Sequence, residues 1–434
     1  MRIILCRSMW IIALWAGLPA VTRSQVLEVS TLAGATQIGS ADGPGAQARF
    51  NNPYGVATDK AGAVYVADQA NSTIRKITAG GVVSTFAGTV DERGWQDGSR
   101  TNARFAEPIG LAVDANGTVF VSDLVGDTIR RINVDGAVTT IAGLSGVSGI
   151  ADGEGSGARF FGPAGLAVDG AGNVFVADAG NHTIRKVAAG GLVSTVAGMP
   201  RVSGRVDGVG ANARFNSPWG LALDPAGSLY VTDHNNNTIR KIAPDGTVST
   251  LAGLAGTAGS ADGQGGAARF NGPWGLAVDG VGNVYVTDYW NSTIRRITPS
   301  GLVTTVAGVA GISGSADGLG SASRFSNPTG VAVDLNGNVY VADSFNNAVR
   351  LGLPGVSSAS PSLTVRLTDD STGPEVVLTW PTNAVSYRLE SSASLSAGAV
   401  WVPSSGAVTL VGGSFQVSEG AGIGSRFYRL IASP

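Results

Sequence analysis

Apolar and polar residues alternate in short runs along most of this chain, and a period of two predicts β-strands rather than helices. In the clearest stretch the predicted strands, named a to d, are Gly55–Thr58, Val64–Ala67, Thr73–Thr78 and Val82–Ala87. Asp and Gly residues, which suit tight turns, separate the strands, and strands b and c are joined by a tight loop over 68–72. The pattern therefore predicts a unit of four short strands.

This four-stranded unit recurs six times at a constant spacing. An Arg-Phe pair, Arg49-Phe50 in the first copy, marks each unit, and residues equivalent to Asp42, Asp68 and Arg75 recur with it. Successive copies of the Phe are 55 residues apart, at Phe50, Phe105, Phe160, Phe215, Phe270 and Phe325. Four-stranded units repeated around a ring are the blades of a β-propeller. We therefore predict an all-β chain whose residues 25–351 form a six-bladed β-propeller.

The ends of the repeat array indicate that the ring closes. Strand d reads VSTFAG in the first copy, and similar segments follow in the next four, but the sixth copy stops at Leu351 without one. The missing segment is found at the other end, as VSTLAG over Val29–Gly34. This N-terminal strand is expected to complete the last blade and to remove an exposed sheet edge. An open solenoid, the alternative for a repeat protein, needs no such exchange.

Segments such as PWGLAVDGVGNVYVTDYWNSTIRRI (Pro273–Ile297) resemble NHL repeats. The resemblance covers about residues 29–351 and is specific for the fold rather than for a function. Proteins of this architecture bind proteins, RNA or glycans, and some cleave small molecules. The resemblance also implies that the d–a and b–c connections share one face, around the mouth of the central channel.

The two ends of the chain differ in composition from the repeats. Residues 1–24 combine Arg2 and Arg7 with the apolar stretch Met9–Val21, which is typical of a secretory signal peptide and too short for a transmembrane helix. Residues 352–362 have the composition of a linker. Short alternating runs over 363–434 predict a small β-sandwich, which resembles C-terminal domains of secreted proteins from environmental bacteria. We therefore expect a secreted or extracytoplasmic protein with no membrane span after the signal.

Charge and cysteine content narrow the function classes further. Without residues 1–24 the chain carries 26 basic and 31 acidic residues, a net charge of −5, and it has no basic cluster. This argues against a nucleic-acid partner. The single cysteine, Cys6, lies inside the predicted signal, so no thiol is expected for catalysis or metal binding.

No catalytic constellation stands out in the repeats. The two histidines, His182 and His234, occupy different repeat positions, and no metal-binding motif or cofactor-binding motif is found. Propeller lactonases, which resemble this fold, hold a divalent cation with Glu, Asn and Asp, and of the few propeller glutamates Glu107 comes closest to an inner strand. A metal-dependent lactonase or lyase is therefore kept as an alternative. The repeated residues Asp42, Arg49, Phe50, Asp68 and Arg75 are interpreted as structural, because every blade needs them.

Positions where the copies differ are the candidates for function. The residues after each loop proline and after each strand-b Asp become aromatic in the later blades. This places a candidate ligand-binding arc at the channel mouth, consisting of Tyr54, Trp219, His234, Trp274, Tyr289, Trp290 and Phe345. Exposed aromatic rings give large contact areas at little entropic cost. We therefore expect a non-catalytic module that binds an extracellular glycan or protein, with a structural spacer as a further alternative.

Overall fold

The structure is a computed structural model. It describes residues 26–354 in full and, further along, the backbone of the strands that lie between residues 364 and 432. The chain divides into two compact units, of which residues 24–355 form one and residues 356–434 belong to the other. The predicted signal peptide lies outside the described residues.

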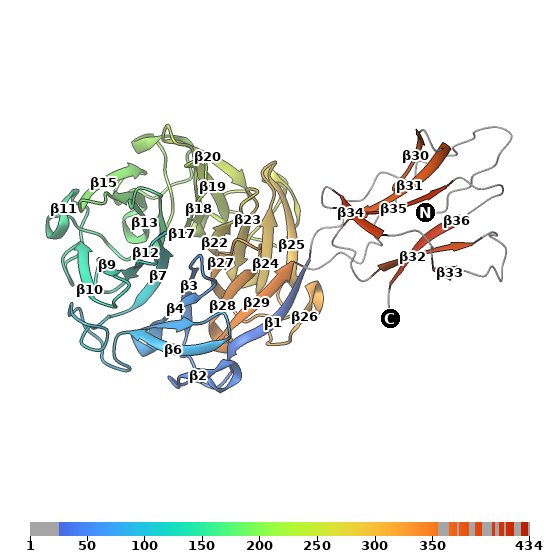
Figure 1. Ribbon diagram of the computed structural model, residues 1–434. Helices are drawn as coiled ribbons and strands as arrows, with labels where there is room; N and C mark the ends of the chain where they lie inside the picture. Colours follow the sequence, from blue (N-terminus) through green and yellow to red (C-terminus); the bar gives the residue numbers. More distant parts are fainter. Residues whose placement is uncertain are drawn as a thin grey trace. The chain divides into compact units, whose positions relative to one another are not determined.

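Six antiparallel sheets arranged around an axis form the first unit, so the predicted six-bladed propeller is confirmed (Figure 1). Strands a line the axis: β3 (Pro53–Thr58), β7 (Pro108–Val113), β12 (Pro163–Val168), β17 (Pro218–Leu223), β22 (Pro273–Val278) and β27 (Pro328–Val333). Strands b follow: β4 (Val64–Asp68), β8 (Val119–Asp123), β13 (Val174–Asp178), β18 (Leu229–Asp233), β23 (Val284–Asp288) and β28 (Val339–Asp343). Strand a begins two residues before its predicted start, at the loop proline.

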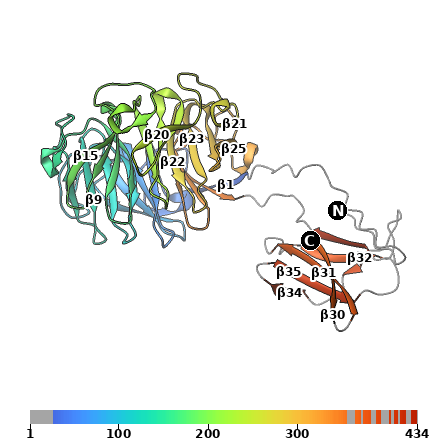
Figure 2. The same cartoon turned by 90° about the horizontal axis from the view of Figure 1, so that it is seen from above.

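The outer half of each blade consists of strands c and d. Strands c are β5 (Thr73–Ile77), β9 (Thr128–Ile132), β14 (Thr183–Val187), β19 (Thr238–Ile242), β24 (Thr293–Ile297) and β29 (Ala348–Pro354). Strands d are β6 (Val82–Ala87), β10 (Val138–Ala142), β15 (Leu192–Ala197), β20 (Thr247–Ala252), β25 (Leu302–Gly308) and, in the last blade, β1 (Leu27–Gly34). Seen from the side, these strands run between two faces of connecting loops (Figure 2).

Most blades have a fifth strand of two residues at their outer edge, which was not predicted from the sequence. These strands are β2 (Gly43–Pro44), β11 (Gly153–Glu154), β16 (Gly208–Val209), β21 (Gly263–Gln264) and β26 (Gly318–Leu319), each paired with strand d of its own blade. In the second blade a single bridge between Gly98 and Val138 takes its place. The long d–a connection is therefore only partly a loop, because its second half runs along the blade edge before it returns to the axis.

The closure by the N-terminal strand is confirmed. In the last blade β1 pairs with β29, with Ser30 opposite Leu351 and Thr31 opposite Arg350, and the two strands lie side by side in Figure 1. Val29 is buried in the core shared by the fifth and sixth blades. Every backbone bond across this pair therefore joins the two ends of the propeller sequence.

Removal of β1 tests how much the ring depends on this closure. We expect a chain that lacks residues 1–35 to unfold at a clearly lower denaturant concentration and to self-associate, because β29 then presents an open strand edge. Denaturant titration measures the midpoint of unfolding, and light scattering measures self-association. A synthetic peptide of residues 26–35 is expected to restore the original midpoint, since an added strand can pair with an open edge. An unchanged midpoint in the truncated chain would contradict the closing role.

A ring of glycines lets the inner strands approach one another at the axis. In each blade the second residue after the loop proline is glycine: Gly55, Gly110, Gly165, Gly220, Gly275 and Gly330. A Cβ atom built at any of them would collide with the carbonyl oxygen of the next inner strand. Because the obstacle is backbone, neither side can move away cheaply. The diameter of the channel is therefore set by main-chain contacts.

A buried arginine ties each blade to its d–a segment. In the first blade the Arg75 guanidinium donates to Asp68 at 2.7 Å, to Asp42 at 2.5 Å and to the carbonyl of Arg49 at 3.0 Å. The ring of Phe50 lies 5.2 Å from the guanidinium carbon. Equivalent arginines are fully buried in every blade: Arg75, Arg130, Arg185, Arg240, Arg295 and Arg350. Two carboxylates thus compensate one buried cation in each repeat.

The second unit contains two antiparallel sheets. One has the strand order β30 (Thr364–Asp370), β31 (Gly373–Pro381), β35 (Ser414–Gly420) and β34 (Val408–Val411). The other has the order β33 (Val402–Pro403), β32 (Tyr387–Ser392) and β36 (Phe427–Ala432). The sandwich arrangement stays a prediction, as does the linker, most of which lies outside the described residues. A search of the described residues found no helix with the length and apolar character of a membrane span.

Candidate functional site

One face of the propeller, here called the mouth face, carries the b–c turns and the first halves of the d–a segments. Five of the six b–c turns are short 3-10 turns, such as Gln69–Asn71, and in the second blade a turn over 124–127 takes this place. All six turns end in a residue of left-handed conformation. Hydrogen bonds join these turns to the d–a segments on either side, for example from Asn71 Nδ2 to the Gly39 carbonyl and from the Asp91 amide to the Asn71 carbonyl. The turns are therefore held by neighbours from two blades.

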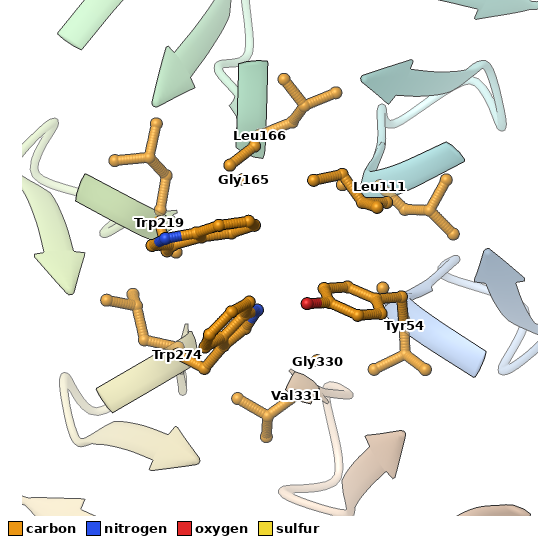
Figure 3. A pocket seen from close by; sticks show the side chains of 17 residues that line it. Tyr54, Leu111, Gly165, Leu166, Trp219, Trp274, Gly330 and Val331 are labelled. Carbon is orange, nitrogen blue, oxygen red and sulfur yellow. The ribbon is translucent and has the colours of Figure 1, made fainter. Parts of the chain in front are cut away.

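All seven predicted arc residues belong to one contiguous group of ring contacts at the channel mouth, here called the aromatic cluster. At its centre the rings of Trp219 and Trp274 lie 4.2 Å apart, tilted by 33°. Tyr289 continues this stack, 4.7 Å from Trp274, and the edge of His234 meets Trp274 at 4.7 Å. Tyr54 reaches Trp274 at 5.8 Å. Figure 3 shows Tyr54, Trp219 and Trp274 pointing into the channel from three different blades.

The cluster extends outward from the channel to the surface. Tyr289 is buried, and it contacts Trp290 at 4.6 Å and Phe345 at 6.5 Å, both nearly edge-on. Trp290 and Phe345 are 57% and 60% exposed. The cluster thus combines partly buried inner rings and the buried Tyr289 with two outer rings that are open to solvent.

The pocket below the inner rings is narrow and is lined by uncharged side chains and glycine backbone. It has an empty volume of about 450 Å³, which includes the solvent at its opening. Its wall is built from the inner strands, with the glycine ring above a ring of Val and Leu side chains: Val56, Leu111, Leu166, Leu221, Leu276 and Val331. Among the described residues, those that line the pocket carry no charge.

The ionisable side chains of the inner mouth favour their neutral forms, and one nearby carboxylate is an exception. Burial raises the pKa of Tyr54 well above its usual range, and the nearby Tyr289 and Glu107 add to the shift. Burial also lowers the pKa of His234, whose Nδ1 lies 3.3 Å from the Pro273 carbonyl. The exception is Glu107, which pairs with Arg93 at 3.2 Å. At neutral pH the inner mouth therefore presents uncharged rings with one ion pair at its edge.

His182, the other histidine, acts as a link between blades. Its Nδ1 accepts a hydrogen bond of 3.0 Å from the Ser217 amide of the next blade. Asp127 and Asn237 accept equivalent bonds from the following blade with their side-chain oxygens. All three residues have positive φ, between 51° and 60°. In these blades the position therefore combines a side-chain acceptor with the left-handed conformation, whereas Ser72 and Ser292 share only the conformation.

This link predicts an acid-dependent loss of stability. Burial lowers the pKa of His182 below its usual 6.5. The unfolded chain therefore takes up the proton first, so the stabilisation is complete above pH 6.5 and is lost as the pH falls through the folded pKa. His182→Asn keeps the acceptor without titrating. Denaturation midpoints measured from pH 8 to pH 5 should show that the unchanged protein loses stability relative to this variant, and parallel curves would contradict the role.

No metal centre is found among the described residues, where no group of three or more His, Cys, Asp or Glu side chains could hold an ion. Asp42, interpreted above as structural, accepts bonds from Arg75 and from the amide of Thr85. Asp68 is likewise bonded to Arg75, Asn71 and the Asn51 amide. The carboxylates that recur in every blade are thus occupied within the fold.

Two exposed aromatic residues on the mouth face were not among the site residues predicted from the sequence. Trp95, in the second d–a segment, is 46% exposed and packs against Gly126 and Gly146. Phe161, which directly follows the repeated Phe160, is 49% exposed and packs against Gly180. A comparison of the residue after the repeated Phe would have singled out Phe161, since the other copies carry Asn, Ala or Ser there.

Comparisons with known proteins agree with this fold. The NHL repeat family model matches residues 160–187, 215–242, 270–297 and 325–350. "NHL repeat-containing protein 2" of Homo sapiens is 28% identical over 296 residues, which cover 59% of this chain and 40% of that protein. "Protein SUPPRESSOR OF QUENCHING 1, chloroplastic" of Arabidopsis thaliana is 28% identical over 61% of this chain and 26% of its own length. The chain thus spans less than half of these relatives.

Solved structures show the same fold at low sequence identity. A Bacteroides thetaiotaomicron protein of unknown function has a TM-score of 0.60 at 23% identity, covering 76% of both chains. An "auxiliary nutrient binding protein" from Bacteroides ovatus has a TM-score of 0.57 at 19% identity, covering 76% of this chain and 77% of the other. A gluconolactonase from Xanthomonas campestris has a TM-score of 0.50 at 14% identity, covering 77% and 93%. These likenesses show the fold alone.

Proposed function

We propose that this chain, a six-bladed β-propeller built from NHL repeats, is an extracytoplasmic binding protein that recognises a glycan or protein ligand at its mouth face. The observation that carries the proposal is the aromatic cluster, in which rings from four blades meet where the channel opens. Such rings offer large, rigid contact areas that lose little conformational entropy on binding. The Bacteroides ovatus neighbour is named an auxiliary nutrient binding protein, and a binding role for this chain is compatible with that name.

The cluster is better suited to binding than to catalysis. Its pocket wall is uncharged, and burial raises the pKa of Tyr54 and lowers that of His234, so both favour their neutral forms. A ligand that presents apolar surface can displace water from these rings, whereas a reaction needs a positioned acid, base or metal. The metal-dependent lactonase or lyase stays an alternative, and elemental analysis with a lactone panel tests it. A stoichiometric divalent ion with turnover would favour the enzyme over the binding protein.

Removing both inner tryptophans tests the site. Trp219→Ala together with Trp274→Ala is expected to weaken ligand binding by at least about a hundredfold, because buried central aromatic residues dominate binding energies. A glycan array and a peptide array, probed with residues 25–434, identify the ligand, and calorimetry then measures both affinities.

Trp95→Ala is the matched control, since it removes an exposed aromatic ring from the same face but from outside the cluster. It is expected to bind as the unchanged protein does. If the double variant keeps full affinity for every ligand found, the cluster is not the site. If no saturable ligand is found on either array, the spacer role becomes the better account.

A further inference from the structure

Trp290 lies at the outer end of the aromatic cluster and is fixed from below. A Cβ atom added to Gly272 would collide with Cδ1 of Trp290, and it would come within 3.0 Å of Cε1 of His234. The indole therefore rests on the bare backbone of Gly272, with the Tyr289 ring against its other edge at 4.6 Å. Despite these supports it is 57% exposed. An aromatic ring that is both immobilised and open to solvent loses little entropy when a ligand stacks on it.

The segments beside Trp290 are almost uncharged and carry mostly small side chains, although Leu254 and Ile312 are exposed there. Two d–a segments flank its turn, because Asn291 donates to the Gly259 carbonyl and accepts from the Gly311 amide. Neither segment, 254–261 (LAGTAGSA) or 309–316 (VAGISGSA), contains a charged residue. Arg205 reaches the rim of this sector, where its Nη1 lies 3.4 Å from the Ala255 carbonyl. The segments that flank the turn of this exposed ring thus offer small hydroxyl and aliphatic side chains and no charge of their own.

This combination selects one class of ligand. A neutral sugar chain presents flat C–H faces to an aromatic ring and a rim of hydroxyl groups to uncharged polar neighbours. A charged polymer finds no complementary charge in the flanking segments. The inner rings and Trp290 belong to one continuous series of contacts, so a ligand that occupies both must extend over more than one unit.

From this arrangement we propose that the protein binds the end of a neutral polysaccharide chain, with its terminal unit at Trp219 and Trp274 and a following unit stacked on Trp290. The proposal rests on the function proposed above and names its ligand class. Phe345, 60% exposed and in contact with the same Tyr289, extends the outer surface. The pocket below the inner rings is encircled by all six inner strands, so a ligand that enters it is expected to do so with a chain end rather than a chain middle.

The test compares chain lengths across four variants. The probes are glucose and the neutral gluco-, xylo- and manno-oligosaccharides from two to six units, measured by calorimetry. We expect the affinity to rise by about tenfold or more from one unit to several. Trp290→Ala should remove that rise, because the following unit then has no exposed ring to stack on. The Trp219→Ala, Trp274→Ala double variant should lose binding of every length.

Gly272→Asn provides a test without removing the indole. Asn52 and Asn327 occupy the same repeat position with φ of 54° and 51°, so the backbone accepts Asn where Gly272 has φ of 62°. The new side chain collides with Trp290 and is expected to abolish the length dependence. Gly162→Asn is the matched control, because an added Cβ there meets only Leu124, at 3.5 Å. It should bind all lengths normally.

The possible failures are distinguishable. If single units and hexasaccharides bind equally well, or if Trp290→Ala keeps the length dependence, the outer platform is wrong and the proposed binding site stands. If only peptides bind and the inner double variant loses them, the ligand class is wrong while the site stands. If the inner double variant changes nothing, both proposals fall.

Discussion

Arg240→Met is expected to destabilise the propeller by about 3–5 kcal/mol, the usual effect of removing one partner from a buried ion pair. Arg240 donates to Asp233 at 2.7 Å and to Asp207 at 2.6 Å, and Asp233 is fully buried. Without the guanidinium, Asp233 keeps only its bonds from the Asn216 amide and from Asn236. The methionine replaces the apolar stem but leaves a buried carboxylate without a counter-ion.

Two further variants separate the charge from the packing. Arg240→Met combined with Asp233→Asn should recover part of the lost stability, because no buried charge is then left unpaired. Lys241→Met, which removes the neighbouring cation near the surface, should cost less than about 1 kcal/mol. Urea denaturation gives each value. If Arg240→Met is as unstable alone as it is together with Asp233→Asn, Arg240 does not stabilise the fold through its ion pair with Asp233.

The same variant should respond to pH. Burial raises the pKa of Asp233 to about 6, and the charge of Arg240 acts to lower it. Loss of the cation raises the folded pKa further above the unfolded one, so the folded variant takes up a proton that the unfolded chain does not hold. The destabilisation is therefore largest above the folded pKa and becomes smaller as the pH falls through it. Repeating the urea series between pH 8 and pH 5 checks this direction.

Gly220→Ala is expected to cost about 2–4 kcal/mol through overpacking of the ring axis. Its new Cβ would collide with the Trp274 carbonyl and lie 3.0 Å from the Leu276 amide nitrogen, and both atoms belong to the next inner strand. Relief requires that two blades move apart, and such a movement also shifts Trp219 against Trp274. Ligand binding should therefore weaken together with stability.

Gly280→Ala is the matched control for this substitution. Gly280 has open space around the position of a Cβ, and its backbone lies outside the left-handed region. Its replacement should be neutral or slightly stabilising, because alanine restricts the unfolded chain. Thermal unfolding of both variants gives the comparison. Equal melting temperatures would show that the inner strands separate without cost.

The features that depend on repetition could be predicted from the sequence, and those that depend on contacts between different repeat positions could not. The displaced VSTLAG segment was enough to predict closure by β1. In contrast, a two-residue strand such as β2 has no alternation to detect. The aromatic positions were visible because the copies differ there. That Tyr54 reaches Trp274 follows from the three-dimensional path across the sixth blade, whose inner strand carries the small Thr329 between them.

The support of Trp290 by Gly272 shows the same limit. The two residues lie in different repeat positions of one blade, and their contact depends on the left-handed backbone at Gly272. Read along the sequence, Gly272 is one of many loop glycines. Only the packed turn shows that its missing side chain leaves room for the indole.

The closing strand also constrains the order in which the molecule can assemble. β1 is the first propeller strand to be synthesised, and its partner β29 is the last, so β1 must wait unpaired while five complete blades form. During that time a second segment of identical sequence can compete with β1 for the same place in the last blade. The sequence VSTLAG recurs over Val248–Gly253, and its first five residues belong to β20. Connectivity, rather than local sequence, therefore decides which strand fills which blade. Two chains that meet before their rings close can exchange these strands, and the expected misfolded product is a strand-swapped dimer.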